Sequence, residues 1–358
     1  MTDRKKTRTR PNPRRVMAPC CGEILHRGFS RRSVLAGFMA STGAAALGIG
    51  LPGTARAQEG SIGFPDMARI RDENDHWPEG YDRQILVRWG DALFPDSPAF
   101  DPANLTAAAA ERQFGYNNDL TLFLPLGGAS ARGLLLVSHE YATPYLMFPD
   151  MTAEDYRDRM TDDQIRVLMA ATGVSILEVA REGATWAVQT GSRFNRRIHM
   201  STPIALSGPA AGDPRLVTTA DPTGKLVLGT ISNCNGGMTP WGTMLSGEER
   251  AMDVFAGDYT TLPDQEVVER QGWDEDENDG YALSRVDPRF VFETEPNEMY
   301  RFDWVVEIDP LDPTAMPVKR TALGRFTHEG AHCTVAPDGR VVVFMGDDDD
   351  FEYLYRFV

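Results

Sequence analysis

The residues with the clearest chemical capacity lie in one stretch, residues 229–249. Cys234 follows a short apolar run and precedes a Gly-Gly pair, and a second short run ends in two adjacent carboxylates, Glu248 and Glu249. A thiolate is a soft metal ligand and carboxylate oxygens are hard ones, while glycine lets the backbone turn or approach closely. The stretch therefore either binds metal or forms a turn with a solvated acidic pair and a buried cysteine, a residue type commonly found inside proteins.

Two further polar clusters follow predicted strands. Glu140 ends the run Ser138-His139-Glu140, and Glu329 lies within residues 327–332 beside two histidines. A single His-Glu pair at a strand end is more often a hydrogen-bonded surface pair than a site. Taken with Cys234, however, these residues supply thiolate, imidazole and carboxylate groups. Such a set suits mixed binding of Ca²⁺, which prefers oxygen, and a transition metal.

Other acidic runs carry a weaker signal. Residues 274–280 suggest a calcium loop of the EF-hand type, but Asp279 stands where that loop needs glycine and Arg285 where it needs the closing glutamate. Residues 347–350 are four consecutive aspartates, which predict a solvated turn with the capacity to offer Ca²⁺ one ligand. The sequence contains no Gly-x-Ser-x-Gly elbow and no P-loop, which disfavours serine hydrolases and nucleotide-phosphate enzymes.

The elements that must position these residues are mostly short strands. Gly, Pro and Asp turns separate apolar runs at spacings typical of a propeller or a sandwich, so we expect an all-β fold. One segment, residues 152–182, has helical periodicity and predicts a small helical insertion. We expect a hairpin between 216–219 and 225–231, and strands at 84–90, 120–124, 133–140, 186–188, 197–199, 304–310, 334–336, 340–345 and 351–358.

Residues 1–57 read as a targeting segment. Arg31 and Arg32 precede an apolar, Ala- and Gly-rich run, and Ala55-Arg56-Ala57 fits a small-residue cleavage site. Paired arginines before such a run indicate twin-arginine export, and the alternative is an uncleaved N-terminal anchor helix. We therefore expect the export machinery as a partner and a periplasmic or secreted mature protein from residue 58. No later apolar stretch is long enough to span a membrane.

The mature chain is strongly acidic. The whole chain has a formal charge of −16, and residues 1–57 hold eleven Lys and Arg against two acids, so residues 58–358 carry −25. Such a charge repels nucleic acid and anionic membranes, and it indicates either a highly solvated surface or bound divalent cations. Of the four cysteines, Cys20 and Cys21 leave with the signal. Cys234 and Cys333 either form a disulfide or remain as a ligand and a buried thiol.

Several motifs in order resemble the PhoX-type alkaline phosphatases. They are the twin-arginine signal and the segments Asn233–Thr243 with Glu248-Glu249, Trp304–Pro310, Arg325–Ala331 and Gly339–Asp348. The resemblance implies a six-bladed β-propeller and a site of ferric iron (Fe³⁺) and calcium (Ca²⁺) bridged by an oxo group. It further implies hydrolysis of small phosphate monoesters outside the cytoplasm.

The resemblance also implies roles for individual residues. Cys234 matches an iron-bridging cysteine and Glu329 a metal-binding glutamate, and both are expected to be catalytic. Glu140, Glu248 and Glu249 are the further metal ligands that it suggests.

The chain departs from the family pattern in three respects. Asn235 stands where a smaller residue is expected, and Gly247 where a cysteine is expected. Family members are much longer, so the phosphatase domain at 58–358 is expected to be incomplete at its C-terminus. The alternatives are a non-catalytic, calcium-stabilised propeller that binds a partner, an inactive fragment of the phosphatase, and a calcium-only esterase or lactonase propeller.

Overall fold

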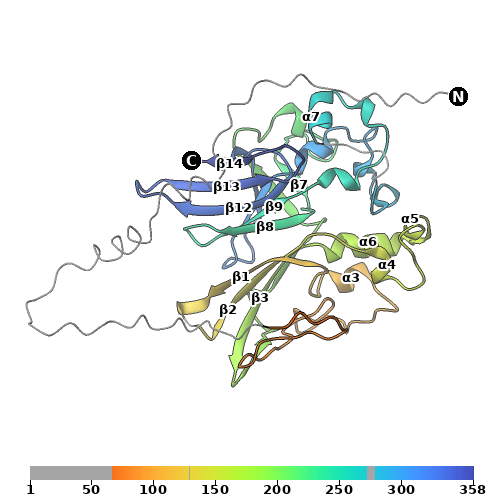
Figure 1. Ribbon diagram of the computed structural model, residues 1–358. Coiled ribbons are helices and arrows are strands. Elements are labelled where there is room, and N and C mark those ends of the chain that lie inside the picture. The colour runs from red at the N-terminus through yellow and green to blue at the C-terminus, as the bar shows by residue number, and fades with distance from the viewer. Residues whose placement is uncertain (1–66, 129, 272–278) are drawn as a thin grey trace, which may run out of the picture. The chain divides into compact units, whose positions relative to one another are not determined.

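A computed structural model describes residues 67–128, 130–271 and 279–358 (Figure 1). The chain divides into two units, 1–80 and 81–358. The predicted signal peptide, and most of the acidic run at 274–280, lie outside the described residues. In residues 67–80, the described part of the first unit, there is no helix or strand, and the Asp72 carboxylate lies 2.9 Å from the His76 ring. All further elements belong to the second unit.

The first sheet of this unit is antiparallel and has five strands. Its order is β1-β2-β3-β4, and β5 pairs with β3. Strand β3 is buried over most of its length, and Leu134 and Leu136 of β2 are fully buried beside it. The strands are β1 (Asn118–Pro125), β2 (Arg132–His139), β3 (Gly173–Glu182), β4 (Thr185–Val188) and β5 (Arg196–Ile198).

The helical insertion expected at 152–182 is only half correct. Helix α6 (Asp162–Ala171) starts at a capping box, in which Thr161 and Gln164 exchange side-chain and backbone hydrogen bonds. The helix ends before Gly173, which has a φ of +99°, and the chain continues as β3. The run after Gly173 is apolar on both faces because β3 is buried on both faces, and periodicity alone does not separate such a strand from a buried helix.

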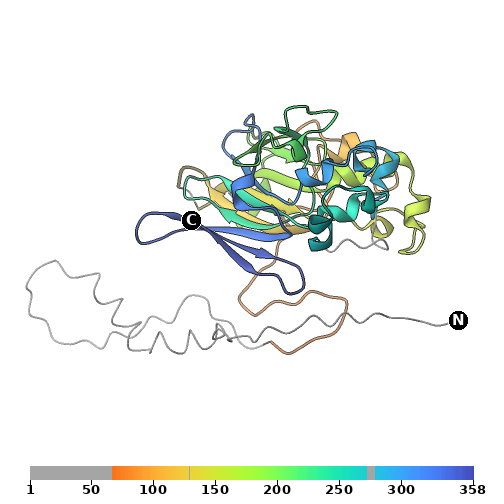
Figure 2. The same cartoon turned by 90° about the horizontal axis from the view of Figure 1, so that it is seen from above.

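The second sheet has six strands and the third has three. The second has the order β7-β6-β11-β10-β9-β8; only β11 and β6 are parallel. Its strands are β6 (Pro203–Ser207), β7 (Leu226–Leu228), β8 (Asn233–Met238), β9 (Met244–Glu248), β10 (Val305–Ile308) and β11 (Val318–Arg320). The third, antiparallel, comprises β12 (His328–Val335), β13 (Val341–Asp347) and β14 (Leu354–Phe357). Strand β12 lies beside β8 and β9 (Figures 1 and 2).

The remaining elements are short helices between the strands. A group of phenylalanines packs among them, with the Phe255 ring centroid 5.3 Å from Phe290 and 5.5 Å from Phe292. The α-helices are α3 (Ala107–Ala110), α4 (Pro144–Met147), α5 (Tyr156–Arg159) and α7 (Gln265–Arg270). The 3₁₀ helices are Leu126–Gly128, Pro214–Leu216, Ala251–Val254, Tyr259–Thr261, Leu283–Arg285, Pro288–Phe290, Glu298–Arg301 and Thr321–Leu323.

Two other predicted elements are wrong. Residues 84–90 form no strand; instead the Gln84 side chain donates to the Trp186 carbonyl and accepts from the Trp186 N–H. Residues 216–219 form no hairpin with 225–231, because β7 pairs with β6. The Asp221 carboxylate accepts hydrogen bonds from the N–H groups of Lys225 and Leu226. In both places a polar side chain satisfies backbone groups that a strand partner was expected to satisfy.

The architecture as a whole is mostly β with few helices, as predicted. The described residues form three separate sheets, and none of these sheets closes on itself. Within the described residues, every helix is too short or too polar to cross a lipid bilayer.

A fully buried ion pair joins two strands of the second sheet. Lys319 Nζ lies 2.7 Å from Glu248 Oε1, and both side chains are inaccessible to solvent. Glu248 Oε2 also accepts the Trp304 N–H at 3.1 Å, and Lys319 Nζ donates to the Arg301 carbonyl at 2.9 Å. Burial lowers the pKa of Lys319 to about 8 and raises the pKa of Glu248, and the attraction between the two groups opposes both shifts.

We predict that Lys319→Met destabilises the protein by about 3–5 kcal/mol, because Glu248 is left as a buried, unpaired charge. Denaturant unfolding monitored by tryptophan fluorescence measures the loss. The double variant Lys319→Met/Glu248→Gln is expected to recover roughly half of it, since the uncompensated charge is gone. A single variant as stable as the wild type would contradict this account.

Candidate metal centre

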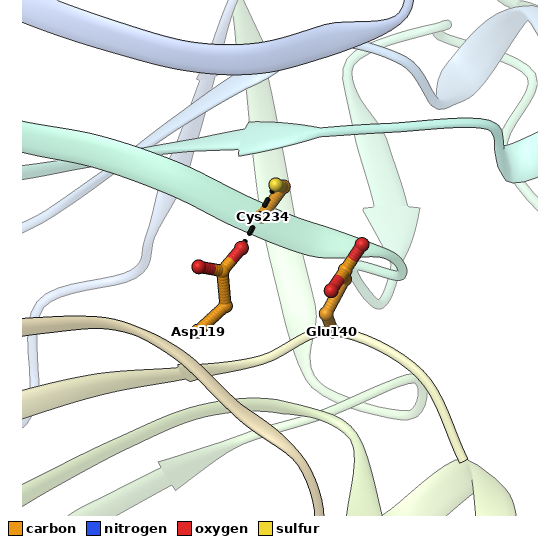
Figure 3. A group of neighbouring side chains, drawn as sticks. All are labelled: Asp119, Glu140 and Cys234. Carbon is orange, nitrogen blue, oxygen red and sulfur yellow. Dashed lines mark hydrogen bonds between the residues drawn. The ribbon is translucent and has the colours of Figure 1, made fainter. Parts of the chain in front are cut away.

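Four carboxylates and one thiol converge where strands of all three sheets end. These residues form two groups of three, and within each group the ligand atoms lie within 4.8 Å of one another. One group is Asp119, Glu140 and Cys234, and the other is Cys234, Glu249 and Glu329. Cys234 belongs to both groups and is 3% exposed. Figure 3 shows Asp119 and Glu140 directed toward Cys234, whose S–H donates to Asp119 Oδ2 at 2.8 Å.

Local irregularities in the strands direct these side chains. The pairing of β1 with β2 shifts register between Asn118 and Thr121, around Asp119. The pairing of β8 with β9 shifts just after Asn233, at Cys234, and that of β12 with β13 shifts around Glu329. Such bulges bend a strand and re-aim a side chain, and they are common beside active sites. Three of the five residues therefore owe their direction to a break in the regular ladder.

Strand pairing brings the remaining residues alongside. Asn118 pairs with His139, which places Asp119 near Glu140, one residue beyond β2. Asn233 pairs with Glu248, which places Cys234 near Glu249, one residue beyond β9. The strand register thus brings Glu140 and Glu249, which follow strand ends, close to Asp119 and Cys234, which lie at bulges.

Gly247 allows β12 to approach β9 closely. A Cβ at Gly247 would lie 2.5 Å from the His328 carbonyl oxygen, a distance that side-chain carbons do not adopt. His328 immediately precedes Glu329, so the missing side chain lets Glu329 reach the cluster. At Gly247, where the family pattern leads us to expect a cysteine, this backbone therefore leaves no room for a side chain.

The electrostatics of the cluster favour a cation. Burial, followed by hydrogen bonding to Asp348 and repulsion from Glu329 and Glu140, raises the pKa of Glu249 to about 8. Burial and the charge of Asp119 raise the pKa of Glu140, and burial and nearby acids raise the pKa of Glu329. Burial and the bond to Asp119 raise the pKa of the Cys234 thiol. A bound cation reverses these shifts, and the mixed donor set suits a metal that takes sulfur as well as one that takes only oxygen.

Of the predicted ligands, Glu248 does not join this cluster. Its carboxylate points to Lys319, because neighbouring residues of a strand face opposite sides of the sheet. The nearby histidines do not join it either: His139 Nε2 lies 2.7 Å from Ser175 Oγ, and His328 Nε2 donates to the Gly324 carbonyl. Burial lowers the pKa of both histidines, which keeps them neutral. Glu140, Glu249, Glu329 and Cys234 do come together.

Sequence reasoning did not identify Asp119 as a site residue and left Asp348 undecided. Asp119 directly precedes the strand expected at 120–124, and a bulge at the start of β1 turns its side chain to Cys234. Asp348 follows β13 directly and interacts with Glu249 and Glu329. At both positions, the signal in the sequence was an acidic residue next to an apolar strand.

The two cysteines of the described chain are free thiols. Cys333 packs in an apolar cluster with Val343 and Met345, apart from the carboxylates. The structure thus favours one cysteine at the site and one buried thiol over the alternative of a disulfide.

We predict that calcium stabilises the protein and that a chelator reverses the effect. At about 100 times its dissociation constant, a ligand that binds only the folded state adds about 2.7 kcal/mol. Thermal unfolding with calcium and with chelator measures the difference. Glu249→Gln should reduce it and Glu154→Gln, an exposed acid outside the cluster, should not; equal calcium effects in the two variants would count against the site.

We further predict that Gly247→Ala destabilises the protein by about 1–3 kcal/mol, since the added methyl group forces β12 away from β9. The same variant should bind calcium more weakly, because Glu329 moves with β12. Gly191→Ala is the matched control, since a Cβ there meets nothing within 4 Å. Calorimetric unfolding and calcium titration test both effects, and a Gly247→Ala protein that matched the control would refute the close-approach argument.

Comparison with known proteins gives the chain a family. The family described as alkaline phosphatase PhoX matches residues 62–358. Among solved structures, Pseudomonas fluorescens PhoX in complex with vanadate, a transition state analogue, is 42% identical with a TM-score of 0.72. The match covers 78% of this chain and 47% of that one, so this chain spans about half the length of the solved protein. A search of curated proteins found no match. The profile match extends over most of the sequence, and the chain belongs to the PhoX alkaline phosphatase family.

Proposed function

We propose that this chain is a phosphomonoesterase, an alkaline phosphatase that releases inorganic phosphate from small phosphate esters. The observation that carries the proposal is the cluster around Cys234, in a chain 42% identical to a phosphatase solved with a transition-state analogue. Vanadate imitates the five-coordinate phosphorus of phosphoryl transfer, a reaction that depends on positioning and on stabilising charge. A cluster of acids that holds cations is suited to supply both.

We propose Ca²⁺ and Fe³⁺ as the metals. Cys234 is the ligand suited to iron, and Asp119, Glu140, Glu249 and Glu329 are suited to calcium, with Asp348 as a further oxygen donor. When bound, such ions polarise phosphoryl oxygens and offset the charge that develops on them. Glu248 is left out of the set, because Lys319 holds it in the core.

The protein's own groups have three tasks. Cys234 must lose its proton to bind metal, and Asp119 Oδ2, which accepts that S–H at 2.8 Å, is the first acceptor available. The buried position of Cys234 keeps water away from the sulfur. Glu329 approaches from the third sheet and brings a carboxylate to the same thiol. We therefore keep Cys234 and Glu329 as the residues most directly involved in catalysis.

We also propose that the three sheets are parts of a six-bladed propeller whose strand ends surround the site. The support is that strands of each sheet contribute an acidic residue or the thiol. For location we propose twin-arginine export to the periplasm or beyond, on the evidence of Arg31, Arg32 and the apolar run that follows. The strong negative charge favours small-molecule substrates over nucleic acid, and we propose no stable membrane insertion once the signal is removed.

The proposed function is tested by phosphate release from a simple aryl phosphate, with and without a calcium chelator. Release that the chelator abolishes is the expected result. A folded protein that released no phosphate would overturn the proposal and favour the binding module or the inactive fragment. Iron analysis of the same sample then separates these two, since the binding module needs calcium alone.

We predict that Cys234→Ser loses most of the phosphatase activity and most of the bound iron, because a hydroxyl is a far poorer soft ligand than a thiolate. Cys333→Ser, a buried cysteine outside the cluster, should retain both. Phosphate release and metal analysis on the two purified variants make the comparison. Full activity with normal iron in Cys234→Ser would remove Cys234 from the site.

A further inference from the structure

A group of buried, uncharged polar side chains accompanies the acidic cluster. Its four members share complete burial, with 0% of each residue exposed, and they are Ser138, Thr230, Asn233 and Ser246. We call these residues the buried network. Its place in the chain ties it to the metal centre, because Asn233 directly precedes Cys234 and Ser138 lies two residues before Glu140.

Hydrogen bonds join the buried network across two sheets. Asn233 Nδ2 donates to Ser246 Oγ at 3.2 Å and to Thr230 Oγ1 at 2.8 Å. Ser246 Oγ lies 3.3 Å from Ser138 Oγ, within hydrogen-bond distance. Ser138 belongs to β2 of the first sheet, whereas Asn233 and Ser246 belong to β8 and β9 of the second. The network therefore crosses between the two sheets that supply four of the five residues of the cluster.

The donors and acceptors of the buried network match one another. The Asn233 amide uses its nitrogen toward Ser246 and Thr230, and the Thr230 hydroxyl donates to Asn233 Oδ1 at 3.0 Å. Because Ser246 Oγ accepts from Asn233, its own hydrogen is available for Ser138 Oγ. A buried polar group that loses its partner costs more free energy than the hydrogen bond contributes. The network therefore resists any change in the distance between β2 and β9.

The hydrogen bond between Cys234 and Asp119 links the same two sheets but depends on protonation. Its donor is the S–H group, and it is lost when the thiol gives up its proton to bind metal. Serine hydroxyls and asparagine amides remain donors under these conditions. The contact between Ser138 and Ser246 therefore persists in the state in which the ligands must keep their spacing.

We propose that Asn233 and Ser246 are positioning residues of the metal centre, which hold the ligands of the second sheet at a fixed spacing from those of the first through Ser138. They act through the ligands that neighbour them in the chain, by keeping β2 in place against β8 and β9. The inference rests on the proposed function in one respect, that the acidic cluster holds calcium.

The test is a calorimetric titration of calcium into the full chain after treatment with a chelator. Ser246→Ala should bind calcium about tenfold more weakly than the wild type, a loss typical of residues that orient metal ligands. Ser138→Ala removes the other end of the same contact and should cause a similar loss. If Ser246→Ala does not fold, Ser138→Ala decides the question from the first sheet.

Thr321→Ala is the matched control. Thr321 is also buried, and its hydroxyl donates to the Ser207 carbonyl and accepts the Ala210 N–H. It belongs to neither the cluster nor the buried network. Without metal, Thr321→Ala and Ser246→Ala should both lower the melting temperature, because each removes a buried hydrogen-bonding group. Only Ser246→Ala should bind calcium more weakly.

A double-mutant cycle measured in calcium affinity separates positioning from a general loss of stability. Ser138→Ala and Ser246→Ala remove the two ends of one contact, so the double variant should bind calcium about as weakly as either single variant. Thr321→Ala shares no contact with Ser138, so the effects of Ser138→Ala and Thr321→Ala should be independent.

The outcomes separate the positioning role from the proposed function. The expected losses of calcium affinity in a protein that releases no phosphate support the positioning role and count against the phosphatase. Phosphate release with wild-type calcium affinity in Ser246→Ala and Ser138→Ala overturns the positioning role and leaves the phosphatase standing. Independent effects of these two substitutions, or absence of calcium binding by the wild type, also overturn the positioning role.

Discussion

Repulsion between carboxylates is the constraint on which the rest of this structure depends. Asp119, Glu140, Glu249 and Glu329 surround one buried thiol. Burial, followed by the influence of neighbouring acids, raises the pKa values of Glu140, Glu249 and Glu329. Side chains free to move would separate. They remain together because each is fixed by a strand end or a bulge, and the sheets behind those strands pack on apolar cores. The free energy of folding thus offsets the repulsion between the assembled like charges, and a cation bound at the centre would relieve that repulsion.

The adjacent residues Glu248 and Glu249 show that residue type alone does not determine which side chain belongs to such a site. Alternation along β9 turns Glu248 into the core, where Lys319 neutralises it, and the end of the strand turns Glu249 to the cluster. Composition identifies the pair as acidic and nothing more. Which member binds depends on the registry of β9 with its neighbours, a property of long-range pairing that two adjacent identical residues do not encode.

Local patterns predicted what depends on local chemistry. The mostly β fold and the strands around β1 and β2 followed from apolar runs that end in polar residues. The choice of Cys234, Glu140, Glu248, Glu249 and Glu329 as ligands also needed the family resemblance, and it included Glu248, which lies outside the cluster. Predictions were wrong where tertiary contacts decide the local structure. Residues 173–182 looked helical because β3 is buried on both faces. Residues 84–90 form no strand, and the Gln84 side chain makes hydrogen bonds where a strand partner was expected. Asp119 depended on a bulge, which leaves little trace in a single sequence.

The distribution of the ligands over three sheets has a mechanical consequence. Asp119 and Glu140 come from the first sheet, Cys234 and Glu249 from the second, and Glu329 from the third. Ions held by all of them would link three sheets that are otherwise joined by packing and by side-chain hydrogen bonds such as that from Cys234 to Asp119. Fraying of any one sheet then breaks coordination for the others, so metal loading makes the opening of these sheets a single cooperative event.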